Sequence, residues 1–151
     1  MSGSATEQGS EAARLSRSEA GLSAALAWRT SAWTAGIAIA INLIVLGLGR
    51  VAGADMSVQP PGSPAPMTIG VVQVVATVLV PLLVATGLLI ATRRRGARAW
   101  RLLAIVGLAV GLVTVAMPVL ATATVATTMV LATMHVITGL VWIILVWRAA
   151  R

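Results

Sequence analysis

His135 is the only histidine in this chain of 151 residues, and it lies in the apolar run 127–147. An ionisable residue inside such a run is by default a candidate functional residue, because burying a charge in a bilayer is costly. An imidazole can serve as a general acid or base, or it can hydrogen-bond to a ligand. If the run is helical, the face of His135 carries small and hydroxyl-bearing side chains, which favours contact with other helices over contact with lipid. The residues on that face are Thr128, Leu131, Ala132, Thr138, Gly139 and Trp142. We therefore expect His135 to point into a helical bundle.

Two amide side chains in other apolar runs could reach the histidine. At helical rise, Asn42 lies roughly 13 Å from the outer end of its run and His135 roughly 12 Å from the outer end of its own. Gln73 lies in the first turns of a third run and shares a stripe with Thr77. We expect the two amides and His135 to meet in one polar layer in the outer half of a membrane. The predicted ligand-binding residues are His135, Asn42, Gln73, Thr77, Thr138 and Trp142.

The polar layer has three interpretations. Amide and imidazole side chains between membrane helices commonly hydrogen-bond to one another, each contributing about 0.6 kcal/mol, and such a layer needs no ligand. Alternatively, the layer is the floor of an outward-opening pocket for a lipophilic small molecule. A proton or ion pathway is the weakest interpretation, because no acidic residue lies inside any apolar run.

Asp55 and Arg50 follow the first apolar run and mark the expected outer mouth of the bundle. Acid–base catalysis needs two titratable groups within hydrogen-bond reach of a bound substrate. In the enzymatic alternative, Asp55 is the acid or base, His135 is its partner, and Arg50 stabilises charge on an isoprenoid or lipid. This alternative requires Asp55 to fold down over His135. We expect no metal and no cofactor, because the chain has no cysteine, a single histidine and four acidic residues.

The elements that must position these residues are membrane helices. Charged residues make up 10% of the chain, against about 25% in soluble domains, and 58% of the residues are hydrophobic. The sequence predicts an all-α fold, a four-transmembrane-helix bundle formed by residues 28–151, and a disordered cytoplasmic tail at residues 1–27. The expected spans are residues 33–51, 68–92, 102–117 and 127–147. A cleaved signal peptide is the rival interpretation of the first span, and the long, acid-containing segment before that span argues against it.

The arginines set the predicted orientation. All eleven basic residues are arginines, and most of them flank the apolar runs, notably in residues 93–101 and 147–151. The positive-inside rule therefore places both termini in the cytoplasm of a bacterial plasma membrane. The same placement favours contact with anionic membrane lipids over nucleic acid. Gly107 and Gly111 form a small-residue face that predicts packing within the molecule, and a homo-oligomer or a subunit of a larger complex is the alternative.

Several short motifs resemble those of a known family. They are "AGAD" after the first run, "PMTIG" at the start of the second, the arginine cluster between the second and third, and "LATMH" in the fourth. Over residues 30–148 the chain resembles a family of small four-helix membrane proteins from actinobacteria, classed as a domain of unknown function. The resemblance implies a helical membrane fold in the cell envelope. It brings no catalytic residues. We expect a small non-enzymatic accessory or lipophile-binding protein, with a membrane enzyme acting on an isoprenoid or lipid, or a small subunit of a larger membrane complex, as the alternatives.

Overall fold

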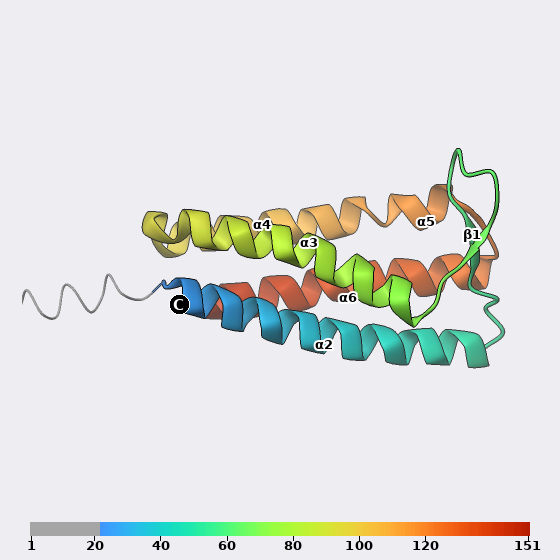
Figure 1. Ribbon diagram of the computed structural model, residues 1–151, viewed down its shortest axis with the longest axis horizontal. Coiled ribbons are helices and arrows are strands. Elements are labelled where there is room, and N and C mark those ends of the chain that lie inside the picture. Colours follow the sequence, from blue (N-terminus) through green and yellow to red (C-terminus); the bar gives the residue numbers. More distant parts are fainter. Residues whose placement is uncertain (1–21) are drawn as a thin grey trace, which may run out of the picture.

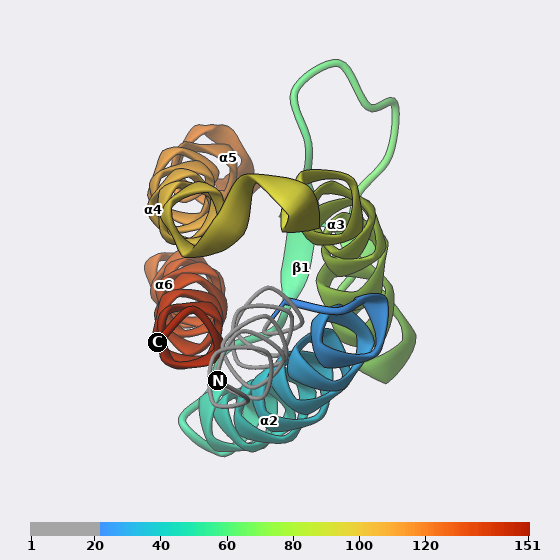
Figure 2. The same cartoon turned by 90° about the vertical axis from the view of Figure 1, so that its left-hand side faces the viewer.

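Four long helices lie side by side in the computed structural model, which describes residues 22–151 (Figure 1). They are α2 (Ala24–Val51), α3 (Val71–Thr92), α4 (Gly96–Val113) and α6 (Val125–Ala149), and a short helix, α5 (Ala116–Leu120), follows α4. Viewed along the bundle, α2 and α4 lie at opposite corners, as do α3 and α6 (Figure 2). Each long helix overlaps one of the four apolar runs of the sequence. Helix α6 extends beyond its expected span at both ends, α2 and α4 begin before theirs, and α3 begins shortly after its own.

The first helix begins earlier than the sequence predicted. The hydroxyl of Ser23 caps α2 by accepting a hydrogen bond from the amide of Leu26 at 3.0 Å. Ala27 is fully buried against the core, although the prediction assigned it to a tail. The bundle therefore includes residues 24–27, and the rest of the predicted tail, residues 1–21, lies outside the described residues.

The arginine-rich segment reverses the chain between α3 and α4. A 3₁₀ turn, η1 (Arg93–Arg95), leads into Gly96, whose φ of 76° is a left-handed conformation that suits glycine. Across this turn the indole nitrogen of Trp100 donates a hydrogen bond to the carbonyl of Leu89 at 3.0 Å. Trp100 is fully buried and belongs to the core of the bundle.

Helices α4 and α6 approach closely at two glycines. A Cβ added at Gly107 would overlap the indole Nε1 of Trp142, and one at Gly111 would meet the Cα of Gly139 at 3.3 Å. The indole also donates a hydrogen bond to the carbonyl of Leu103 at 3.2 Å. The small-residue face predicted for α4 is therefore covered by α6 of the same chain.

A small antiparallel sheet closes the end of the bundle that carries Asp55. Strand β1 (Ser57–Gln59) pairs on one side with β2 (Met67–Thr68) and on the other with β3 (Thr122–Ala123). The sequence predicted only loops here, so the all-α prediction is incomplete at this point. The sheet ties the loop after α2 to the connection between α5 and α6.

Three segments are long and apolar enough to cross a membrane. They are Ala24–Val51, Val71–Leu120 and Val125–Ala149, and the second of them contains α3, α4 and α5. Large apolar side chains cover the outside of the helices, for example Val72 with 75% and Ile44 with 61% of the side chain exposed. An outer surface of this kind is compatible with lipid as the surrounding solvent.

Candidate functional site

His135 shares one stripe of α6 with residues that pack against other helices. Residues on the same stripe contact neighbouring helices: Thr138 contacts α2, and Gly139 contacts α4. The Nδ1 atom of the half-buried His135 is 2.7 Å from the carbonyl oxygen of Leu131, one turn earlier in the helix. A carbonyl can only accept, so Nδ1 carries a proton, and in the Nδ1–H tautomer Nε2 is the acceptor atom. Within residues 22–151, no group donates a hydrogen bond to that nitrogen.

Asn42 is joined to α6 through Thr138 and not through the histidine. Its Nδ2 donates a hydrogen bond to the hydroxyl of Thr138 at 2.9 Å. That hydroxyl donates its own proton to the carbonyl of Met134 at 2.9 Å, so it can only accept from Asn42. This arrangement fixes the amide orientation and leaves Oδ1 of Asn42 buried without a partner among the described residues.

The structure corrects the prediction for the amide on α3. Oε1 of Gln73 accepts a hydrogen bond from the backbone N–H of Gly70 at 3.0 Å, which caps the start of its own helix. Thr77, on the same stripe, is exposed and donates to the carbonyl of Gln73 at 2.8 Å. The inward face of α3 is instead apolar apart from one threonine, with Val74, Val78, Leu82, Thr86 and Leu89 buried. Gln73 is therefore engaged in its own helix and not in the predicted layer, and Asn42 bonds to Thr138 instead of to His135.

Asp55 is held at the loop end of the bundle by hydroxyl groups of α6. Its Oδ1 accepts hydrogen bonds from the hydroxyl of Thr127 at 2.7 Å and from the amide of Ser57 at 3.2 Å. Thr124 caps α6 by accepting from the amide of Thr127, and its hydroxyl lies 3.4 Å from the same carboxylate oxygen. The Thr127 hydroxyl, followed by the Ser57 amide, holds the pKa of this exposed carboxyl below its ordinary value of 3.8.

Met56 is a site feature that sequence reasoning missed. Its φ of 55° is left-handed, which is uncommon for a residue other than glycine. Its N–H donates to the Thr127 hydroxyl at 3.1 Å, and its carbonyl accepts from the amide of Ile69 at 2.8 Å. Its side chain is fully buried with Leu46, Ala54, Val74 and Met134. The loop thus buries the Met56 side chain between the helices at the loop end of the bundle. A single methionine in a polar loop is the only signal that could have indicated it.

The three residues of the predicted acid–base site do not come together. Asp55 is bonded to Thr127, which precedes His135 by two turns of α6, about 12 Å along the helix. Arg50 donates a hydrogen bond to the carbonyl of Ile69 at 3.0 Å. Asp55 therefore does not fold down over His135. Among residues 22–151, no group of three or more His, Asp and Glu side chains gathers in a way that could hold a metal ion.

Two hollows open on the surface between α2 and α6. One, of about 280 Å³, lies toward the loop end and is lined by Val45, Leu48, Gly49, Ala52, Met129, Val130 and Thr133. The other, of about 170 Å³, lies at the opposite end and contains Arg29 and Trp33. Neither is lined by Asn42, Gln73 or His135. Trp142, predicted to bind a ligand, packs between α4 and α6.

Comparison with known proteins identifies the family of this chain. No curated protein and no solved structure matches it. Residues 22–151 match a family model described as a family of unknown function, DUF6069, and this range includes every helix described above. It also includes Asn42, Asp55 and His135. The chain therefore belongs to the DUF6069 family.

Proposed function

We propose that the protein is a four-span integral protein of a bacterial plasma membrane, with both termini in the cytoplasm, which binds a lipophilic molecule without catalysing a reaction. One observation carries the binding proposal: Oδ1 of Asn42 is buried in the apolar bundle and has no hydrogen-bond donor among the described residues. Ser31 Oγ, also on α2, is the other buried polar atom without a partner there, and Nε2 of the half-buried His135 is a further candidate acceptor.

His135 lies near this amide along α6. Asn42 bonds to Thr138, and His135 precedes Thr138 by three residues, about one turn of the helix. A buried acceptor without a donor, such as Oδ1 of Asn42, costs about 1–3 kcal/mol, so a partner that supplies a donor is favoured. A lipophilic molecule with a hydroxyl or N–H group would supply that donor.

The two rival proposals have less support. The enzymatic alternative needs Asp55 near His135, and Asp55 is instead bonded to Thr127 at the loop end. The alternative of a subunit in a larger complex rested on the glycine face of α4, and α6 occupies that face.

The test is to purify the full chain gently in detergent and to extract its bound small molecules for mass spectrometry. We expect a co-purifying lipophile in the wild type, and we expect His135→Leu and Asn42→Leu to lose it while remaining folded. The matched control is Thr133→Val, which changes an exposed residue of α6 whose hydroxyl bonds only to its own helix. Equal ligand content in all four proteins would show that the acceptors serve only to join helices.

A further inference from the structure

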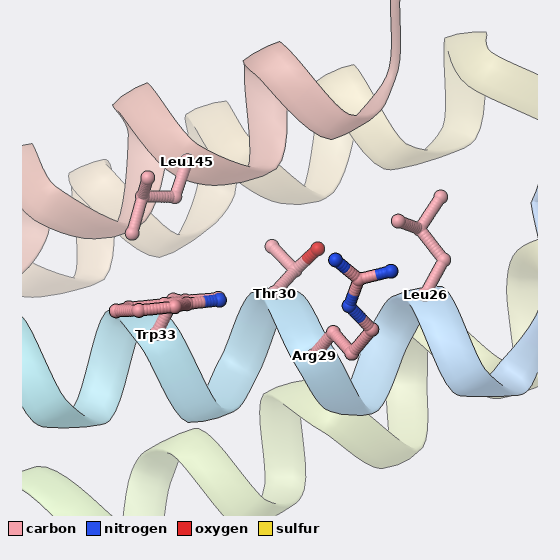
Figure 3. Close-up of a pocket in the computed structure, with 5 residues that line it drawn as sticks. All are labelled: Leu26, Arg29, Thr30, Trp33 and Leu145. Atoms are coloured by element: carbon pink, nitrogen blue, oxygen red, sulfur yellow. The ribbon is translucent and has the colours of Figure 1, made fainter.

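The hollow of about 170 Å³ at the end of the bundle opposite Asp55 combines one cation with an apolar wall. It lies between α2 and α6, and its lining residues are Leu26, Arg29, Thr30, Trp33 and Leu145 (Figure 3). Four of them come from the first turns of α2 and the fifth from the last part of α6. The hollow thus lies where the first helix begins and the last helix ends.

Arg29 has no acidic neighbour in the part of the chain that the structure describes. Asp55 is the only acidic residue among residues 22–151, and it lies at the far end of α2. The guanidinium group of Arg29 is exposed and carries a fork of N–H donors suited to phosphate oxygens. An anion entering the hollow would therefore meet a cation that is not already neutralised by a described carboxylate.

The rest of the hollow suits a hydrocarbon chain. Trp33 lies one turn from Arg29 on the same face of α2, and 65% of its side chain is exposed. Leu145 faces it from α6 (Figure 3). Exposed Trp28 and Trp147 lie on the neighbouring turns of the two helices, which is the level at which tryptophan meets the membrane–water interface. The polar end of the hollow is thus at headgroup depth, and its apolar end leads toward the hydrocarbon core.

We infer that this hollow is a binding site for one anionic phospholipid of the adjoining leaflet. Its phosphate group bonds to Arg29, and the start of one acyl chain lies over Trp33 and Leu145. This site is separate from the acceptors at Asn42 and His135, so either proposal can fail without the other.

The experiment is a titration of the full chain in detergent with phosphatidylglycerol, followed by native mass spectrometry. We expect Arg29→Gln to weaken the tightest lipid-binding event about tenfold, the size expected for losing a hydrogen bond between charged groups. The matched control, Arg94→Gln, removes the same charge from the exposed turn at the same end, and we expect a change of less than about twofold. Phosphatidylcholine with the same acyl chains should bind at least about tenfold more weakly than phosphatidylglycerol.

Four outcomes would overturn the inference. Equal losses in Arg29→Gln and Arg94→Gln would mean that lipid is attracted only by the summed charge of this end. Equal binding of the two lipids would exclude recognition of an anion. Displacement of the lipid by inorganic phosphate at equal concentration, or unchanged binding in Leu145→Ala, would exclude the acyl-chain contact. Circular dichroism of each variant checks that the helices remain folded.

Discussion

A side-chain hydrogen bond joins Asn42 of α2 to Thr138 of α6. The effects of substitutions at these two positions on the free energy of unfolding should therefore be coupled. In a double-mutant cycle of Asn42→Leu and Thr138→Val, we expect a coupling free energy of about 0.6 to 1.7 kcal/mol, the range measured for hydrogen bonds between membrane helices. The measurement is reversible unfolding in detergent. Gln73→Leu is the control, because Gln73 caps its own helix and should be additive with Asn42→Leu. A coupling free energy of the same size between Asn42 and Gln73 would instead support the polar layer that the sequence predicted.

Asp55 predicts a pH dependence of stability with a definite sign. Its pKa is lowered in the folded protein, chiefly by the Thr127 hydroxyl, so folding favours the ionised carboxylate. The stabilisation is present above the ordinary pKa of 3.8 and is lost as the pH falls below that value through the lowered pKa. We therefore expect the melting temperature of the wild type to exceed that of Asp55→Asn at about pH 6, with the difference shrinking toward about pH 3. A constant difference across this range would show that the carboxylate charge does not contribute.

At the scale of elements, Gly107 determines how closely α4 and α6 approach. We expect Gly107→Ala to destabilise the protein by about 1–3 kcal/mol, because the added methyl group would overlap the indole of Trp142. The control is Gly87→Ala on the exposed face of α3, where an added Cβ meets nothing within 4 Å. Alanine favours a helix over glycine by about 0.5–1 kcal/mol, so the control should be neutral or stabilising. Thermal unfolding of the two variants in the same detergent distinguishes them, and equal effects would argue against the close approach.

The helices were predictable where the length of an apolar run determines the structure. Each long helix overlaps an apolar run, and His135 shares its stripe with Thr138 and Gly139, which contact neighbouring helices. The rotation of α3 was not predictable in this way. Gln73 and Thr77 form a polar stripe that looked suited to the interior, but both side chains satisfy their hydrogen bonds within α3, so that face can turn outward.

The loop end could not be predicted because its structure depends on contacts between distant residues. Strand β1 is three residues long and pairs with residues about ten and about sixty-five positions away, so no local periodicity marks it. The burial of Met56, a loop residue, likewise depends on Thr127 of α6, whose hydroxyl accepts a hydrogen bond from the N–H of Met56. Position along the sequence carries no information about such pairs.

At the scale of the whole molecule, the lengths of the helices and the positions of the arginines bear on how many times the chain crosses the membrane. Helix α2 has 28 residues, about 42 Å at helical rise, which exceeds the roughly 30 Å of a hydrocarbon core. The segment Val71–Leu120 is interrupted by three arginines and Gly96, where the chain turns back on itself (Figure 2). If both α3 and α4 cross, the chain crosses four times, and the arginine-rich turn lies on the same side as both chain ends. If this segment crosses only once, the crossings number three and the two ends lie on opposite sides.

Reporter fusions separate these two topologies, which differ at the C-terminus. With a reporter active only outside the cytoplasm, we expect signal from a fusion after Gly62 and none from fusions after Arg95 or Arg151. Gly62 lies in the loop at the end that carries Asp55, whereas Arg95 and the C-terminus lie at the other end (Figure 1). The positive-inside rule puts the arginine-rich end in the cytoplasm, since moving arginines across a bilayer is disfavoured. Signal at both Gly62 and Arg151 would establish an odd number of crossings. Signal at both Arg95 and Arg151 with none at Gly62 would instead invert the bundle, and the arginines around the Arg29 hollow would then face the outer leaflet.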